Sequence, residues 1–225
     1  MTKLRSGLKR LRAVLAAEPN SRELWERSRT RWRAAQPVNH LTWARDLNGD
    51  AFVSRMESYD VFNPTASLLE IGPGYGRLLK SIISRQLSFS SYLGVDISPH
   101  NIDYLNRTFA ALNVEFKQGD IERTTLAKEF DVVFSSLTFK HLFPTFEAVL
   151  ANVTRELAPR GWVFFDLIEG SGHHFENDGV TFLRHYPKTE VLEILARCGL
   201  QLAAWDEVLH TPEHKRLLVV ARKSV

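Results

Sequence analysis

Short apolar runs alternate with amphipathic segments from about residue 66 onward, and this alternation leaves few possible folds. Each apolar run has the length of a strand, and each segment between them has the period and length of a helix. Strands separated by helices of this length form a parallel sheet that is covered on both faces. The predicted strands are residues 66–71, 91–97, 114–120, 130–136 and 161–168, and the predicted helices are residues 76–86, 98–112, 145–157 and 188–199.

The C-terminal part departs from this alternation. Residues 200–209 and 215–223 are both strand-like, and only residues 210–214 separate them. This connection is too short for a helical crossover, so the two strands should pair antiparallel. Because crossovers between parallel strands are right-handed, the carboxyl ends of the other strands lie along one edge, where such sheets bind ligands.

A glycine-rich turn follows the first predicted strand. Gly72, Gly74 and Gly76 stand in the segment EIGPGYG (residues 70–76), directly before a predicted helix. Glycines allow positive φ and remove the Cβ atoms that would strike a ligand. The helix N-terminus adds free N–H groups for a phosphate or a carboxylate. The NAD-binding pattern would place its third glycine at position 77, where Arg77 stands instead.

Acidic residues stand at the ends of three successive predicted strands. Asp96 lies 24 positions after Gly72, where an acid can accept both ribose hydroxyls of an adenosine. Asp120 follows the next strand and can accept from the adenine amino group, with Ile121 packed on the ring. A turn or helix cap would explain one such acid. Glu70, Asp96 and Asp120 together indicate an edge that binds an adenosyl group.

These segments together resemble a known family. EIGPGYG, GVD, QGDI and DVVFSSLTFKHL occur in the order and at the intervals of the class I, seven-stranded S-adenosylmethionine-dependent methyltransferases. The resemblance covers about residues 48–223. It implies a Rossmann-like, doubly wound α/β fold, with a mostly parallel seven-stranded sheet and an antiparallel last strand. It also implies S-adenosyl-L-methionine as cofactor and methyl transfer as activity.

The resemblance assigns roles to the motif residues. It implies that the glycine turn borders the methionine part of the cofactor and that Glu70 reaches the ammonium group through water. Asp96 would bind the ribose, and Ser135 would border the place where methyl donor and acceptor meet. The implied cofactor-binding residues are Glu70, Gly72, Pro73, Gly74, Gly76, Asp96, Ile97, Asp120, Ile121 and Ser135.

Residues 1–47 lie outside the shared pattern. Ten Lys/Arg and three Asp/Glu give residues 1–37 a net charge of +7, which leaves −4 for the rest of a chain whose net charge is +3. We predict two basic amphipathic helices that form a lid on the main domain, residues 48–225. The alternative is a basic surface for nucleic acid or anionic lipid. Four leucines and two tryptophans on the helix faces favour packing against protein, so a nucleic-acid partner is not expected.

Composition indicates a cytoplasmic globular protein. Apolar residues make up 44% and charged residues 24% of the chain, and no apolar run is long enough to span a membrane. The N-terminal residues lack the apolar core of a secretory signal. The single cysteine, Cys198, excludes an internal disulfide and a cysteine-rich metal site.

The segment after the fourth predicted strand argues against several methyl acceptors. It reads SSLT, whereas enzymes of this class that methylate adenine or cytosine amino groups carry an Asn/Asp-Pro-Pro-aromatic stretch there. Carbon methylation of cytosine needs a cysteine nucleophile, and Cys198 at a helix end fits packing better. A catechol-type magnesium site needs acids where Ser135 and Ser136 stand, so no metal is predicted. A small-molecule oxygen, nitrogen or sulfur acceptor remains.

The residues around the acceptor are predicted from their place along the same edge. His141 is the first candidate for a general base because its charge can switch near neutral pH; the alternative is a hydrogen-bonded structural histidine. Residues 166–179 follow the fifth strand as a predicted mobile binding loop and supply Asp166 and His173 as further catalytic candidates. The candidate acceptor-binding residues are Trp43, Ser136, Thr138, His174, Arg184 and Tyr186.

Two other functions stay open at this point. An NAD(P)-dependent oxidoreductase or epimerase would share the sheet, but the displaced glycine and the lack of a Tyr-x-x-x-Lys motif count against it. The second is a catalytically silent cofactor-binding module that acts through its basic N-terminal helices on nucleic acid or a protein partner. Salt-dependent RNA binding that is lost on deletion of residues 1–37 would distinguish this module.

Overall fold

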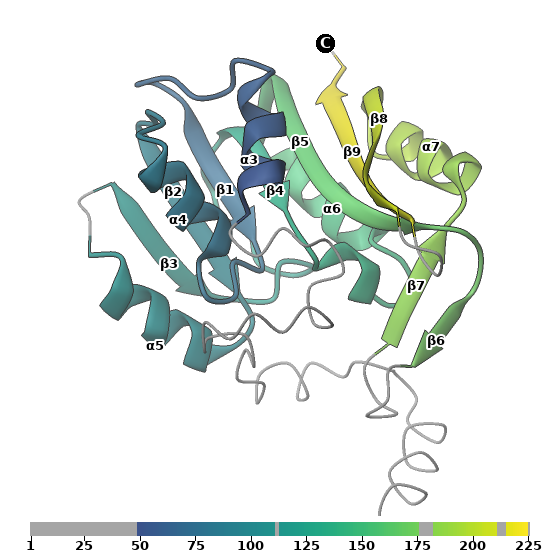
Figure 1. Cartoon of the computed structure of the whole chain (residues 1–225), viewed down its shortest axis with the longest axis horizontal. Helices are drawn as coiled ribbons and strands as arrows, with labels where there is room; N and C mark the ends of the chain where they lie inside the picture. Colours follow the sequence, from purple (N-terminus) through teal and green to yellow (C-terminus); the bar gives the residue numbers. More distant parts are fainter. Residues whose placement is uncertain (1–48, 111–112, 176–181, 211–214, 225) are drawn as a thin grey trace, which may run out of the picture.

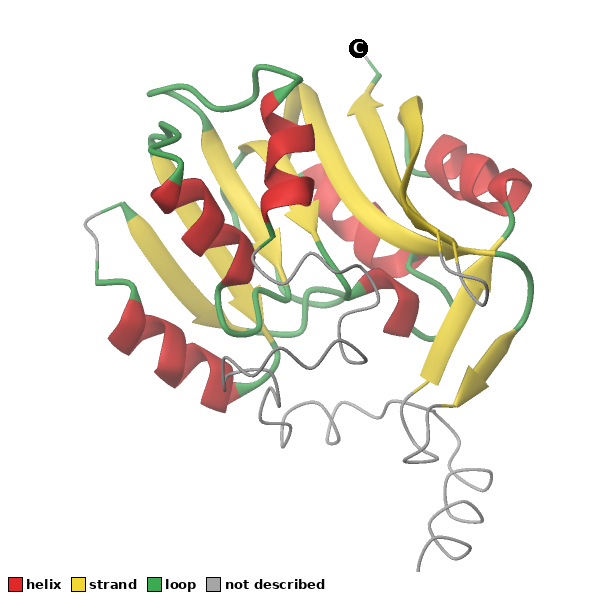
Figure 2. Cartoon of the chain, in the orientation of Figure 1, coloured by secondary structure: helices red, strands yellow, loops and turns green. Residues whose placement is uncertain are grey.

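The computed structural model describes residues 49–110, 113–175, 182–210 and 215–224. The predicted N-terminal extension, residues 1–47, lies outside the described residues, and so does Trp43 within it. The described chain is built around a mixed sheet whose parallel strands alternate with helices (Figures 1 and 2). Among the helices of this part of the chain, none is long and apolar enough to cross a membrane.

The strand order is Rossmann-like. The first five strands are parallel in the order β3-β2-β1-β4-β5, β9 pairs antiparallel with β5, and β8 pairs antiparallel with β9. The predicted fold class and the predicted antiparallel pairing of the last two strands are confirmed. The strands are β1 (Ser67–Ile71), β2 (Ser91–Asp96), β3 (Val114–Gln118), β4 (Phe130–Ser135), β5 (Leu157–Glu169), β6 (His173–Phe175), β7 (Phe182–Tyr186), β8 (Leu200–His210) and β9 (Lys215–Lys223).

Helices cover both faces of the sheet. In β1, Leu68 packs on the face covered by α3, α4 and α5, and Leu69 packs on the face covered by α6 and α7. Burial on both sides explains why the central strands read as nearly continuous apolar runs. The helices are α3 (Asp50–Glu57), α4 (Arg77–Ser84), α5 (Pro99–Thr108), α6 (Glu147–Arg155) and α7 (Lys188–Arg197), with a short 3₁₀ helix, η2 (Phe139–His141).

The start of α5 agrees with its sequence signals, and its end does not. The Asn101 N–H donates to Ser98 Oγ at 3.4 Å, and Pro99 occupies the first helical position. The helix ends at Thr108, four residues before the predicted end at residue 112. Phe109 leaves the helical path and packs against Phe116, with the ring centroids 6.1 Å apart.

The segment after β5 corrects a prediction. Of the predicted mobile loop over residues 166–179, the first residues continue β5, and His173–Phe175 form β6, paired antiparallel with β7, whereas residues 176–179 lie outside the described residues. The loop prediction failed because a three-residue strand with two histidines shows no apolar alternation, and backbone pairing to β7 orders it. Gly170 (φ 140°) and Gly172 (φ 84°) permit the turn. Because β7 pairs parallel with the end of β5, the β6–β7 hairpin prolongs the carboxyl edge of the sheet beside η2 (Figure 1).

Candidate active site

The turn between β1 and α4 has a backbone that suits glycine. Gly72 (φ 67°) and Gly76 (φ 79°) both adopt left-handed conformations. A Cβ on Gly72 would lie 2.5 Å from Thr138 Oγ1, and a Cβ on Gly76 would overlap the ring of Phe109. The turn therefore lies between the loop after β4 and the end of α5. Since α4 begins at Arg77, its N-terminus points its free N–H groups toward this turn.

Asp96, the last residue of β2, ties the turn to the neighbouring strand. Its Oδ2 accepts the Gly74 N–H at 3.0 Å, its Oδ1 accepts the Ser98 N–H at 2.8 Å, and the Asn101 amide donates to both oxygens at 3.2 Å. Burial raises the pKa of Asp96, and the hydrogen bonds from Ser98, Gly74 and Asn101 partly offset that rise. Because these donors already fill the carboxylate, a ribose hydroxyl has to take over one of these positions. The Asn101 side chain is the donor that can move.

Glu70 lies in a buried network below the turn. Its side chain is 2% exposed, and its Oε2 accepts a hydrogen bond from the Tyr92 hydroxyl at 2.5 Å. Burial raises the pKa of Glu70 to about 7, although the bond from Tyr92 and the charge of Arg77 both act to lower it. Glu70 is therefore charged only in part at neutral pH. Its predicted contact to the cofactor ammonium group through water stays a prediction.

Replacing Glu70 by glutamine should remove a pH dependence of stability. The folded-state pKa lies above the usual value of about 4.3, so the folded protein binds more protons than the unfolded chain between these values. The contribution of Glu70 to the free energy of unfolding should thus be fully present below about pH 4.3, and should be lost as pH rises through about 7. Urea unfolding gives the free energy of unfolding of the Glu70→Gln variant relative to that of the wild type. This difference should shift in favour of the variant by on the order of 3 kcal/mol between pH 5 and pH 8. Parallel pH profiles for the two proteins would contradict this.

The residues predicted to hold the adenine and the sulfonium end are near the same edge. Asp120 is half-buried after β3, and its Oδ1 accepts the Glu122 N–H at 3.1 Å, so it also caps a turn. Ile121 is buried in the core, whereas Ile97 is half-buried after β2. Ser135 is buried at the end of β4, where its hydroxyl donates to the Ile71 carbonyl at 2.8 Å. Their roles toward a cofactor stay predictions.

A buried ionic network follows β4. Ser136 Oγ accepts hydrogen bonds from Arg77 at 2.5 Å and from Arg216 at 2.9 Å, and donates to Asp166 Oδ2 at 2.6 Å. The Leu137 N–H donates to Asp166 Oδ1 at 2.7 Å. Asp166 and Arg216 also form an ion pair in which each side chain is 2% exposed. Two predicted site residues, Ser136 and Asp166, are thus brought together, with two arginines that the sequence analysis did not assign.

The network fixes the charge of Asp166. Burial alone would raise the pKa of Asp166, but the charge of Arg216 and the hydrogen bonds from Ser136, Arg216 and Leu137 more than offset it, so the pKa lies below the usual value. Asp166 therefore stays ionised and accepts hydrogen bonds at neutral pH. In this arrangement Asp166 positions Ser136 and Arg216, and proton transfer by Asp166 has no support from its contacts. No sequence motif includes Arg216, so its ion pair with Asp166 could not be predicted and is seen only in the folded chain.

His141 lies at the end of η2, beside β7. Its Nδ1 is 2.8 Å from the Phe182 carbonyl oxygen. A carbonyl oxygen can only accept, so Nδ1 carries the proton and the neutral ring presents Nε2 as the acceptor. Thr138, three residues earlier, contacts the glycine turn at Gly72. The loop after β4 thus places a histidine and a threonine at the edge where the sequence predicts the acceptor.

The β6–β7 hairpin positions the other acceptor-site candidates differently. His173 and His174 are exposed, with their rings near Phe182 (5.2 Å) and His185 (5.3 Å). Arg184 forms an ion pair with Glu190 at 2.7 Å. Tyr186 is fully buried, and its ring centroid lies 5.0 Å from that of Phe146. The hairpin therefore exposes its histidines and holds Arg184 and Tyr186 in contacts with the body of the protein. Within residues 49–110, 113–175, 182–210 and 215–224, no cluster of three His, Cys, Asp or Glu side chains could hold a metal ion.

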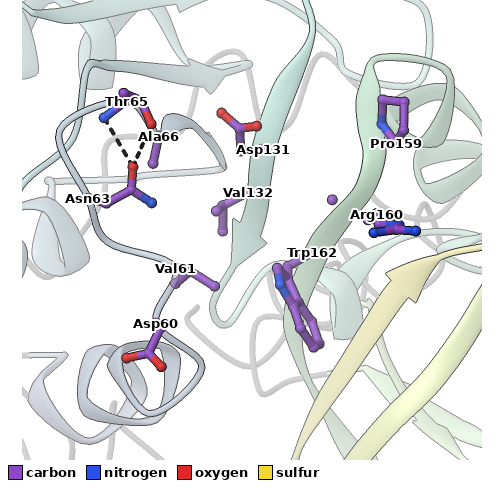
Figure 3. Close-up of a pocket in the computed structure, with 11 residues that line it drawn as sticks. Asp60, Val61, Asn63, Thr65, Ala66, Asp131, Val132, Pro159, Arg160 and Trp162 are labelled. Carbon is purple, nitrogen blue, oxygen red and sulfur yellow. Dashed lines mark hydrogen bonds between the residues drawn. The ribbon is translucent and has the colours of Figure 1, made fainter.

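A separate pocket lies at the opposite edge of the sheet. It has a volume of about 210 Å³ and is lined by residues just before β1, at the start of β4 and in the first half of β5 (Figure 3). Asp131 lines it, but its Oδ2 accepts from the N–H and the hydroxyl of Ser67. Ligands of parallel sheets bind at the carboxyl ends of the strands, so this pocket at the amino ends is distant from the edge described above.

Known proteins share this fold. A family model described as a methyltransferase domain matches residues 69–165. Fatty-acid O-methyltransferase of Mycolicibacterium smegmatis is 31% identical over 99 residues, which cover 44% of this chain and 35% of that protein. An S-adenosylmethionine-dependent methyltransferase from Clostridium acetobutylicum has a TM-score of 0.65 at 13% identity, covering 84% of this chain and 95% of that one. Burkholderia thailandensis 1,6-didemethyltoxoflavin-N1-methyltransferase, solved with bound S-adenosylhomocysteine, has a TM-score of 0.64 at 18% identity, covering 83% and 82% of the two chains.

Residues 69–165 therefore resemble a methyltransferase domain, and the described chain has the Rossmann-like fold of the class I S-adenosylmethionine-dependent methyltransferases. The resemblance read from the glycine turn and the strand-end motifs is confirmed. The chain covers less than two thirds of the length of the first curated relatives that it matches.

Proposed function

We propose that the chain binds S-adenosyl-L-methionine at the carboxyl edge of β1 and β2 and transfers its methyl group to an oxygen, nitrogen or sulfur atom of a small molecule. The hydrogen bond from the Gly74 N–H to Asp96 carries this proposal, because it joins the turn and the strand-end acid into one rigid cradle. The match to a methyltransferase domain supports it. The name of the relative, fatty-acid O-methyltransferase, favours an oxygen acceptor.

The proposal divides the chain at about residue 48. Residues 48–225 would form the cofactor-binding domain, and residues 1–47 would shape the acceptor pocket. Asp96 would bind the ribose, and Asp120 with Ile121 the adenine. The glycine turn from Gly72 to Gly76 would border the methionine part. A cytoplasmic location is part of this proposal.

The protein's main task in such a reaction is alignment. When bound, S-adenosylmethionine supplies an electrophilic methyl group for an in-line displacement. The residues of the chain hold donor and acceptor in line, and alignment of this kind can lower a barrier by about 7–11 kcal/mol. Ser135 and Thr138, which contact β1 and the glycine turn, stand where the two molecules would meet.

Cofactor binding and turnover test the proposed function. Calorimetry with the full chain should show binding of S-adenosylmethionine and S-adenosylhomocysteine with dissociation constants on the order of micromolar, about −8 kcal/mol. Labelled methyl groups should then pass to members of a panel of small acids, alcohols, amines and thiols. Binding without transfer to any of them would favour a catalytically silent module. Absence of binding would overturn the cofactor assignment.

Replacing His141 by glutamine should slow methyl transfer and leave cofactor binding unchanged. If His141 accepts the proton of the acceptor, its loss should lower kcat by about 10²–10⁴-fold. Glutamine can still donate to the Phe182 carbonyl, so the loop should keep its place. The rate profile of the wild type should fall at low pH, where the imidazole is protonated, and the variant should lose that dependence. An unchanged kcat would make His141 a structural residue.

A further inference from the structure

Arg216 carries buried N–H groups that lack an acceptor. Its side chain is 2% exposed, and its Nη2 donates to Ser136 and Asp166. Among the described residues, neither Nε nor Nη1 has a hydrogen-bond partner. Buried donors of a charged group are costly to leave unpaired, so a water molecule, an ion or a ligand should accept from them. A guanidinium has no acceptor capacity, so the missing partner must be an acceptor.

The charge around Ser136 also favours an anion. Arg77 and Arg216 both donate to Ser136 Oγ, and Asp166 is the one carboxylate bonded to that hydroxyl within the described residues. Burial raises the pKa of Glu70, the acid near Arg77, to about 7, so this acid balances the excess only in part at neutral pH. The remaining excess is less than one positive charge, which suits a monoanion such as a carboxylate better than a doubly charged phosphate.

The position of Arg216 places the anion on the acceptor side. Arg216 pairs with Ile168 at the end of β5, and the order β1-β4-β5-β9 puts it three strands from the glycine turn. Adjacent strands lie about 4.8 Å apart, so its backbone is on the order of 14 Å from β1. The side chain reaches back to the end of β4, where Nη2 donates to Ser136, the residue after Ser135. Nε is nearer the backbone than Nη2 and so lies on the β9 side of this contact, away from the glycine turn, which favours the acceptor over the methionine carboxylate of the cofactor as its partner.

We propose that the unpaired donors of Arg216 bind the carboxylate of an acidic methyl acceptor. This proposal rests on the proposed methyl transfer and adds the chemical class of the substrate. With Nη2 held by Asp166 and Ser136, the planar guanidinium presents Nε and Nη1 in two fixed directions, and a carboxylate oxygen can accept from either of them. The N–H groups on Nε and Nη1 are shielded from solvent, so the acid enters with a local rearrangement around β9.

Binding of small acids to the cofactor-loaded protein tests the proposal. The full chain saturated with S-adenosylhomocysteine is titrated with octanoate and benzoate, and with octanamide and benzamide as uncharged matches. The acids should bind at least about tenfold more tightly than the amides. Arg216→Lys keeps the charge but loses the planar fork. It should weaken binding of the acids by about tenfold without changing the affinity for S-adenosylhomocysteine. Arg222→Lys is the control, because it makes the same change at an exposed residue of β9 that stacks on Trp162. It should change neither the affinity for the acids nor the affinity for S-adenosylhomocysteine.

Each other outcome has a distinct meaning. Acids that bind no better than amides to the loaded wild type would overturn the proposal, and this comparison needs no variant that might fold poorly. Acids that compete with S-adenosylhomocysteine, together with weaker binding of that compound by Arg216→Lys, would assign Arg216 to the cofactor carboxylate and also overturn the proposal. Wild-type protein that does not bind S-adenosylhomocysteine would count against the proposed function itself.

Discussion

Replacing Arg216 by methionine should lower the free energy of unfolding by about 3–5 kcal/mol, because it leaves the Asp166 carboxylate buried without its counter-ion. Each side chain of the pair is 2% exposed, so water cannot take the place of the guanidinium. The hydrogen bonds from Ser136 and Leu137 remain, but neither donor carries a charge. Domains are usually stable by about 5–15 kcal/mol, so the variant should retain little of its stability. Urea unfolding followed by circular dichroism at pH 7 measures the loss.

A double variant separates the charge from the packing. Combining Arg216→Met with Asp166→Asn removes the unpaired charge and keeps an acceptor for the Leu137 N–H. Replacing both members of a buried ion pair is often close to neutral, so this protein should recover most of the stability that the single variant loses. Equal instability of the single and double variants would show that the contacts of the Arg216 side chain, and not its charge, stabilise the fold.

Replacing Asp96 by alanine should weaken binding of S-adenosylhomocysteine by about 100-fold. The change removes the predicted acceptor for the ribose hydroxyls, and hydrogen bonds to a charged group contribute about 1.5–3 kcal/mol each. It also releases the N–H groups of Gly74 and Ser98, which hold the glycine turn and the start of α5 in place. Calorimetry at pH 7 on protein shown to be folded by circular dichroism measures the effect.

Asp103→Ala provides the matched control for this prediction. Asp103 lies on α5, four residues after Pro99, and its side chain is exposed. Removing its charge should leave the affinity for S-adenosylhomocysteine within about twofold of the wild type, since exposed charges act weakly. An Asp96→Ala protein that is folded and binds as tightly as this control would remove the ribose assignment.

Local signals in the sequence predicted most of the fold. Ser98 and Pro99 mark the start of α5 because a cap and a fixed φ depend on neighbouring residues alone. The five residues 210–214 exclude a crossover, and this geometry alone made β8 and β9 antiparallel. The glycine spacing and Asp96 identified the turn and the strand end that the Gly74 N–H joins. These features are set by short stretches of chain.

Long-range contacts could not be predicted from short stretches of the sequence. Arg216 and Asp166 are 50 positions apart, and only the antiparallel pairing of β5 with β9 brings them together. The strand β6 has three residues and depends on pairing with β7 for its order. Asp166 and Tyr186 were predicted from their place along the edge. Both lie inside strands, β5 and β7, where alternation along the strand decides whether a side chain faces the core or the edge.

A crystal structure with S-adenosylhomocysteine tests the central claim most directly. The account predicts the adenosyl ribose within hydrogen-bonding distance of Asp96, about 2.6–3.2 Å, and the homocysteine part against the turn from Gly72 to Gly76. The compound bound anywhere else, such as in the pocket beside Asp131 and Trp162, with the edge between β1 and β2 closed by side chains, would contradict it.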